Sequence, residues 1–180
     1  MTTPVLPEPD DKDWTWVLSA LCPDCGFDAR RVQRAEVPEL TVRFTTAIRA
    51  ALARPGAAVR PQPAVWAALE YGCHVRDVCR LFLRRLQLML DEDDPLFENW
   101  DQDITAVEDR YWQQQPAAVA AELAEAADAI ADRFARVLDD QWGRPGRRSN
   151  GSVFTVESLA AYFLHDLAHH AWDVTETAVH

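Results

Sequence analysis

Apolar side chains recur every three to four residues along most of the chain, the spacing that places them on one face of an α-helix. Strand-like alternation with a period of two is nearly absent. Pro116 and Thr155 mark helix starts, because proline is tolerated at the first helical position and threonine is a good N-cap. The pattern predicts helices over residues 37–53, 64–90, 116–142 and 155–176.

The segments between these helices differ in character. Residues 96–115 form a long polar connection that carries several aromatic side chains, so we expect it to be packed and partly helical. Residues 143–151 are a basic, glycine-rich loop. Four long helices with one long crossover connection predict an all-α fold, a four-helix bundle. We expect a flexible acidic segment over residues 1–13 and a single domain over 14–180.

Composition narrows the class of protein. The chain has 180 residues and a formal net charge of −11, so nucleic acid and anionic membranes would be repelled on average. No apolar run reaches the roughly 20 residues needed to span a bilayer, and the N-terminus lacks the basic and apolar regions of a signal peptide. We therefore expect a cytoplasmic protein, monomeric or homodimeric, with no nucleic-acid or membrane partner.

Three of the five histidines carry the candidate chemistry. His165 and His169 are four residues apart on a predicted helix and so project from one face. His74 lies among apolar residues in the second predicted helix. Read separately, each could be a polar face or a hydrogen-bonded core residue; together they predict one divalent-metal site with an open fourth position, zinc first, nickel or iron otherwise. His170 points about 100° away from His169 and is not expected to be a ligand.

Two carboxylates lie one helical turn beyond the predicted ligands. Asp77 follows His74 and Asp173 follows His169, so either could accept the outer ring N–H of a ligand and fix its tautomer. The alternative is that both are ordinary surface carboxylates.

The chain also carries a cysteine element, Cys22-Pro-Asp-Cys25-Gly, that resembles half of a zinc ribbon. Three interpretations remain open for Cys22 and Cys25. They could shape a structural turn, form a redox pair, or approach Cys73 or the metal. Cys73 and Cys79 are six residues apart on a helix and face opposite ways, so they are not expected to chelate together.

A histidine in the second helix of a bundle, followed by H-x-x-x-H-H in the fourth, resembles the DinB-like superfamily over residues 37–176. That superfamily includes mycothiol-dependent maleylpyruvate isomerases and bacillithiol S-transferases. The resemblance implies DinB-like topology, metal ligands at His74, His165 and His169, and mycothiol as a co-substrate. The N-terminal cysteine element departs from the simplest pattern and resembles an actinobacterial subgroup of uncertain activity.

The function expected from this resemblance is a thiol-dependent S-transferase or isomerase for detoxification of small electrophiles, in which a metal activates the thiolate. Rival hypotheses are a zinc-dependent hydrolase and a non-catalytic metal-binding or stress-response module, so whether the chain is an enzyme stays open. The residues expected to line the substrate pocket are Tyr162, Trp172, Trp100 and Arg80.

Overall fold

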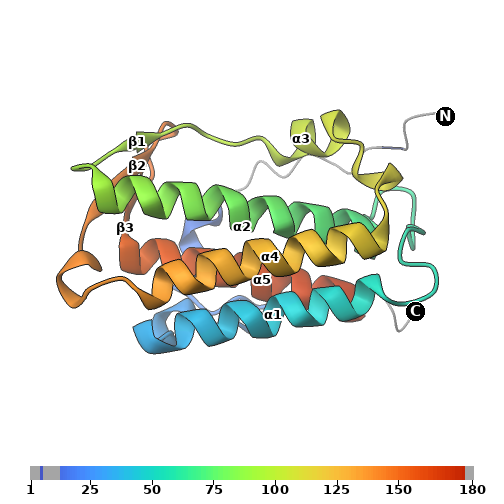
Figure 1. Ribbon diagram of the computed structural model, residues 1–180, viewed down its shortest axis with the longest axis horizontal. Coiled ribbons are helices and arrows are strands. Elements are labelled where there is room, and N and C mark those ends of the chain that lie inside the picture. Colours follow the sequence, from blue (N-terminus) through green and yellow to red (C-terminus); the bar gives the residue numbers. More distant parts are fainter. Residues whose placement is uncertain (1–4, 6–12, 177–180) are drawn as a thin grey trace.

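The computed structural model describes residue 5 and residues 13–176. Four long helices lie side by side as a bundle (Figure 1): α1 (Val37–Leu52), α2 (Ala68–Asp91), α4 (Pro116–Ala135) and α5 (Val156–Glu176). α1 and α2 each pack against both α4 and α5. The predicted all-α bundle is confirmed, whereas the flexibility predicted for residues 1–13 concerns positions that, apart from 5 and 13, lie outside the described residues.

α2 and α4 run in the same direction, so the chain must return along the whole bundle between them (Figure 1). This is the predicted long crossover. It contains strand β1 (Leu96–Phe97), helix α3 (Gln102–Glu108) and a 3₁₀ turn, η4 (Tyr111–Gln113). The Asp101 side chain accepts hydrogen bonds from the first backbone N–H groups of α3, which fixes where that helix begins.

The basic loop between α4 and α5 is not the irregular loop that its composition predicts. Strands β2 (Pro145–Arg148) and β3 (Val153–Thr155) form an antiparallel hairpin, and β1 pairs with β2 in parallel. A Cβ atom at Gly146 would lie 2.6 Å from a side-chain carbon of Met89, so only glycine lets β2 approach α2 this closely. Strands of two to four residues are too short to show a period-2 pattern.

Two helix boundaries differ from the predicted ones, and the local sequence explains each difference. α2 begins at Ala68 rather than residue 64, because the buried Glu70 carboxylate accepts the Ala67 N–H and closes the first turn. α4 ends at Ala135 rather than residue 142. The acidic run that follows α4 is unfavourable at a helix C-terminus and forms a separate 3₁₀ turn, η5 (Asp139–Gln141).

The N-terminal segment runs along α5 before the bundle begins. It contains the 3₁₀ turns η1 (Trp14–Leu18), η2 (Ala29–Arg31) and η3 (Arg34–Glu36). The first two pack against α5, and Arg34 of η3 forms an ion pair with Glu157 of α5. The cysteine element lies between η1 and η2 and is therefore held close to the histidines of α5. In the described part of the chain, no helix combines the length and apolarity that a membrane span requires.

Candidate metal centre

α5 presents two pairs of candidate ligands rather than one. His165 and His169 form one i, i+4 pair, and Asp166 and His170 form a second, rotated by about 100° around the helix. The structure groups the first pair with Cys22 and Cys25, and the second pair with His74. In each group all ligand atoms lie within 4.8 Å of one another. The three histidines predicted to share one ion are thus divided between two neighbouring groups.

The group of His74, Asp166 and His170 has the spacing of side chains that share an ion. One oxygen of Asp166 lies 3.7 Å from His74 Nε2 and 3.8 Å from His170 Nε2. These distances are too long for hydrogen bonds. They are near the roughly 3.4 Å that separates two donors lying about 2.05 Å from one tetrahedral ion. Both His74 ring nitrogens are buried without a hydrogen-bond partner among the described residues, so an ion would satisfy at least one of them.

Burial and the neighbouring side chains together hold these groups in the protonation states that bind metal. It lowers the pKa of His74 below its usual value and therefore favours the neutral imidazole. For Asp166, burial acts to raise the pKa, but the contact with His74 and the nearby histidine rings outweigh it and lower the pKa. Neutral imidazoles and an ionised carboxylate are the states that coordinate a divalent cation.

A second carboxylate orients His170. Its Nδ1 lies 2.8 Å from an Asp173 oxygen, the arrangement in which Nδ1 donates while Nε2 faces Asp166. From the sequence, Asp173 could either orient His169 or be an ordinary surface carboxylate; in the structure it contacts the neighbouring histidine, His170. The carboxylate-on-histidine contact is therefore made with His170, a member of the group with His74.

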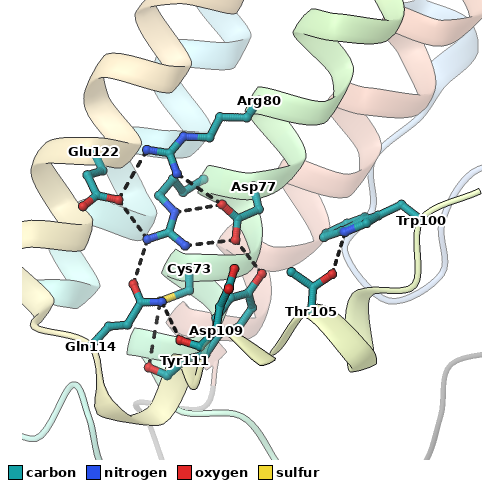
Figure 2. Close-up of polar contacts among 10 residues, drawn as sticks. Cys73, Asp77, Arg80, Trp100, Thr105, Asp109, Tyr111, Gln114 and Glu122 are labelled. Atoms are coloured by element: carbon teal, nitrogen blue, oxygen red, sulfur yellow. Dashed lines mark hydrogen bonds and ion pairs between the residues drawn. The ribbon is translucent and has the colours of Figure 1, made fainter. Parts of the chain in front are cut away.

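Asp77 does not contact a candidate ligand. Figure 2 shows its carboxylate in a polar network, where Tyr111 donates to it at 2.6 Å and Arg80 lies 3.4 Å away. The neighbouring Arg76 guanidinium binds both Asp77 oxygens at 2.9 Å and also pairs with Glu122 on α4. Asp77 thus joins α2 to the crossover and to α4 rather than orienting His74.

A cavity of about 620 Å³ opens beside the His74 group. Two of the four residues expected in the pocket, Tyr162 and Trp100, line it. Arg80 is absent from its walls because ion pairs with Asp77 and Glu122 hold it elsewhere. Trp172 also lies outside the cavity lining and packs against the His169 ring at 5.7 Å.

The walls of this cavity combine aromatic rings with carboxylates. Trp100 stacks on His74 with ring centroids 5.5 Å apart, and Trp66 packs on the same ring at 5.5 Å. Five carboxylates and one guanidinium, that of Arg148, are among the lining groups; the carboxylates belong to Asp13, Asp101, Asp103, Asp166 and Asp173. The cavity is therefore acidic and partly aromatic.

The cysteine element lies beside the other pair of histidines. Cys22 Sγ is 3.7 Å from His169 Nδ1, and Cys22 is buried. Of the three interpretations left open by the sequence, this is the one in which Cys22 and Cys25 approach the candidate metal ligands. Burial, together with the neighbouring Cys22, raises the pKa of Cys25 to about 11, so without a cation this thiol stays protonated. Cys73 and Cys79 are buried in the bundle and belong to neither group.

Comparison with known proteins agrees with the resemblance read from the motifs. A family model described as the DinB superfamily matches residues 45–174, well over half of the chain. The chain belongs to the DinB superfamily. No match is found among curated proteins.

This DinB-superfamily chain is also similar to a solved structure, YfiT from Bacillus subtilis. The TM-score is 0.74 at 18% sequence identity, and the similarity covers 82% of this chain and 86% of YfiT. YfiT is described as a probable metal-dependent hydrolase with an unusual four-helix bundle topology. At this identity the similarity establishes a common fold.

Sequence reasoning missed Asp166 and His170 as partners of His74. The signal was present, since Asp166 and His170 repeat the i, i+4 spacing of His165 and His169 one residue later. Only the rotation of α5 against α2 decides which pair faces His74.

Proposed function

We propose that the chain is a metal-dependent enzyme whose ion is held by His74, Asp166 and His170 and whose reaction is the hydrolysis of a small polar substrate. The observation that carries this proposal is the convergence of two imidazoles and one carboxylate beside a cavity of about 620 Å³. Three protein donors leave room for a substrate, as in catalytic zinc sites with two histidines and a carboxylate. Iron(II) and nickel(II) also accept these donors.

A divalent ion held there would supply Lewis acidity, polarising a substrate carbonyl or phosphoryl oxygen and making water more acidic. The protein's part is to fix the donors and shape the cavity. Asp173 holds the His170 ring through Nδ1, and Trp100 restrains the His74 ring by stacking. Trp100 is itself held by a 2.8 Å hydrogen bond from Nε1 to Thr105 (Figure 2).

The lining indicates the class of substrate. Because carboxylates outnumber the single guanidinium, an uncharged or cationic molecule is favoured over an anion. Trp66, Tyr71 and Trp100 offer flat apolar surfaces for an aromatic or aliphatic part of that molecule. The description of YfiT as a probable metal-dependent hydrolase supports the same reaction class.

Thiol transfer is a second candidate, favoured by the size of the cavity. About 620 Å³ is enough for a thiol and a small electrophile together. In that reaction the thiol would lose its proton, its sulfur would bond to the electrophilic carbon, and the leaving group would depart with its electron pair. Mycothiol is the thiol that the resemblance to DinB-like transferases implies.

The test uses the full chain with its metal. A panel of aryl esters, amides and phosphoesters is assayed in parallel with mycothiol, bacillithiol or glutathione plus a chlorobimane dye. We expect hydrolysis that a chelator abolishes and an added divalent ion restores. Asp166→Asn, which keeps the shape of the side chain, should lower the rate more than about 100-fold, since even groups behind the ligands typically contribute 10–100-fold.

The matched control is Asp128→Asn, at an exposed carboxylate on α4, which should leave the rate unchanged. Activity only in the thiol assays would replace hydrolysis by thiol transfer. Rates no faster than those of metal-free protein in every assay, or full activity in Asp166→Asn, would reject the proposed catalytic group.

A further inference from the structure

A second cluster of metal-binding side chains joins the N-terminal segment to α5. Cys22 and Cys25 on that segment meet His165 and His169 on α5, with all four ligand atoms within 4.8 Å of one another. Two thiols and two imidazoles are a complete donor set for structural zinc. We propose that these four residues form a closed structural zinc site, the N-terminal clamp, distinct from the proposed catalytic group.

Distance and burial support one ion among these atoms. Cys22 Sγ and His169 Nδ1 are 3.7 Å apart, close to the roughly 3.6 Å expected for a sulfur and a nitrogen on one tetrahedral zinc. Cys22 is fully buried, and His165 is 4% exposed. His165 Nε2 has no hydrogen-bond partner among the described residues. A buried polar atom left in that state is unfavourable, and an ion would satisfy it.

The backbone around the cysteines has the shape of a metal-binding knuckle. Gly26 donates from its N–H to the Cys22 carbonyl at 2.9 Å, and Cys22 donates to the Phe27 carbonyl at 3.0 Å. Gly26 has φ +71°, a conformation that glycine adopts without strain. This tight turn brings both cysteines to the same pair of histidines, which a CxxC spacing alone does not guarantee.

The two histidines favour a metal site over a redox-active disulfide as the role of Cys22 and Cys25. A disulfide between Cys22 and Cys25 would use only the sulfurs and would leave His165 Nε2 buried and unsatisfied. Aromatic rings also surround the histidines: Trp14 lies 5.7 Å from the His165 ring and 5.4 Å from the His169 ring. His165 and His169 also line the cavity, so it is the complete set of four protein donors, rather than exclusion of solvent, that describes a structural site.

The clamp has a structural consequence for the cavity. The match to the DinB superfamily begins at residue 45, so both cysteines lie outside the matched region. The clamp thus fastens the segment that precedes α1 to the bundle. Trp14, which packs on both clamp histidines, also lines the cavity beside His74. An ion in the clamp therefore fixes the wall of the cavity that Trp14, His165 and His169 form.

Cobalt substitution tests the clamp by a readout that is independent of enzyme activity. Full-length protein is loaded with Co²⁺ in place of zinc and its absorption spectrum recorded. Tetrahedral cobalt with cysteine ligands gives a thiolate-to-metal charge-transfer band in the near ultraviolet, which a site of histidine and aspartate ligands lacks. We expect that band in the unmodified protein and its loss in the double variant Cys22→Ser/Cys25→Ser.

Zinc content gives the second measurement, with Cys79→Ser as the matched control. Cys79 is buried in α2, and a helical serine can bond to the backbone carbonyl four residues earlier. The double variant should lose one zinc ion per chain, and its residues 19–36 should be cut faster by protease. Cys79→Ser should keep the zinc content and the protease resistance of the unmodified protein. If the double variant does not fold, the cobalt spectrum of the unmodified protein decides.

Two results would overturn the clamp. One is an unmodified protein without the charge-transfer band, including one whose Cys22 and Cys25 are isolated as a disulfide. The other is a double variant that keeps its full zinc content. Neither result bears on the proposed hydrolysis, which is tested by Asp166→Asn and by rate.

Discussion

The two candidate ligand groups share helix α5 and border the same cavity, but they differ in the number and kind of their donor atoms. His165 and His169 meet two thiols, and the four donors leave no free position. One residue further along α5, Asp166 and His170 meet a single histidine beside a cavity. Both pairs line that cavity, so a rotation of about 100° on one helix separates a four-donor group with two sulfurs from a coordinatively open, three-donor group with oxygen and nitrogen donors.

This contrast shows how a helix can serve stability and chemistry in the same turn. Soft thiolates and a full set of donors favour tight, permanent zinc binding. An incomplete set with a carboxylate binds an ion less tightly but leaves it accessible to substrate. Removing each ion should therefore affect a different property of the protein.

The largest expected effect separates the two ions by their removal. A mild chelator should empty the open group first and abolish activity with little change in the melting temperature. A reagent that modifies thiols should then release the second zinc and lower the melting temperature by on the order of 10 °C. This corresponds to a loss of about 3–4 kcal/mol of binding-linked stability.

Metal release and melting temperature are recorded on the same samples at each step, with protein exposed to buffer alone as the control. Release of both ions together, or a fall in melting temperature with the first ion, would contradict the division into a catalytic and a structural group.

A smaller effect is expected from Asp173→Asn. The asparagine keeps the shape of the side chain but weakens the hydrogen bond that orients His170 through Nδ1. Metal affinity of the open group, measured by competitive titration, should fall about 10–100-fold. The zinc held by the cysteines should be unaffected, and Asp128→Asn provides the exposed-carboxylate control. An equal loss of zinc from both groups would mean that Asp173 acts on the whole helix rather than on one ligand.

The four long helices could be predicted because each repeats its apolar pattern over several turns. The start of α5 at the Thr155 cap agrees with the structure: the Thr155 hydroxyl accepts the Ser158 N–H at 3.1 Å. The small sheet could not be predicted, because its pairing partners, Phe97 and Arg148, are distant in sequence and its strands are short. Local patterns therefore determined the helices but not the contacts between loops.

The candidate site shows the same limit. The i, i+4 spacing of His165 and His169 predicts that they act as a pair, and the structure keeps them together. The contact of Cys22 with His169 spans 147 positions and depends on how the N-terminal segment lies along α5. Likewise, His74 faces Asp166 rather than His165 because of how α5 is rotated about its axis against α2, which no local pattern records.

The smallest expected effect concerns the other link between the N-terminal segment and α5. Arg34 pairs with Glu157 through two contacts of 2.8 and 3.0 Å, but both side chains are about half exposed. Exposed ion pairs are screened by water and lose side-chain entropy, so Arg34→Gln should change the melting temperature by less than about 2 °C. Arg31→Gln, at an exposed arginine in the same segment, is the matched control.

Protease cleavage within residues 19–36 sharpens this last comparison. If the cysteine–histidine clamp holds the segment, Arg34→Gln should be cut as slowly as the unmodified protein while zinc is bound, and both should be cut faster once zinc is removed. If the ion pair were the main attachment, Arg34→Gln would be cut rapidly with zinc still in place. Both the cysteine–histidine clamp and the Arg34–Glu157 ion pair join the segment to α5, but only the clamp includes side chains buried from water, those of Cys22 and His165. Proteolysis with and without zinc therefore measures how much each contact holds the segment.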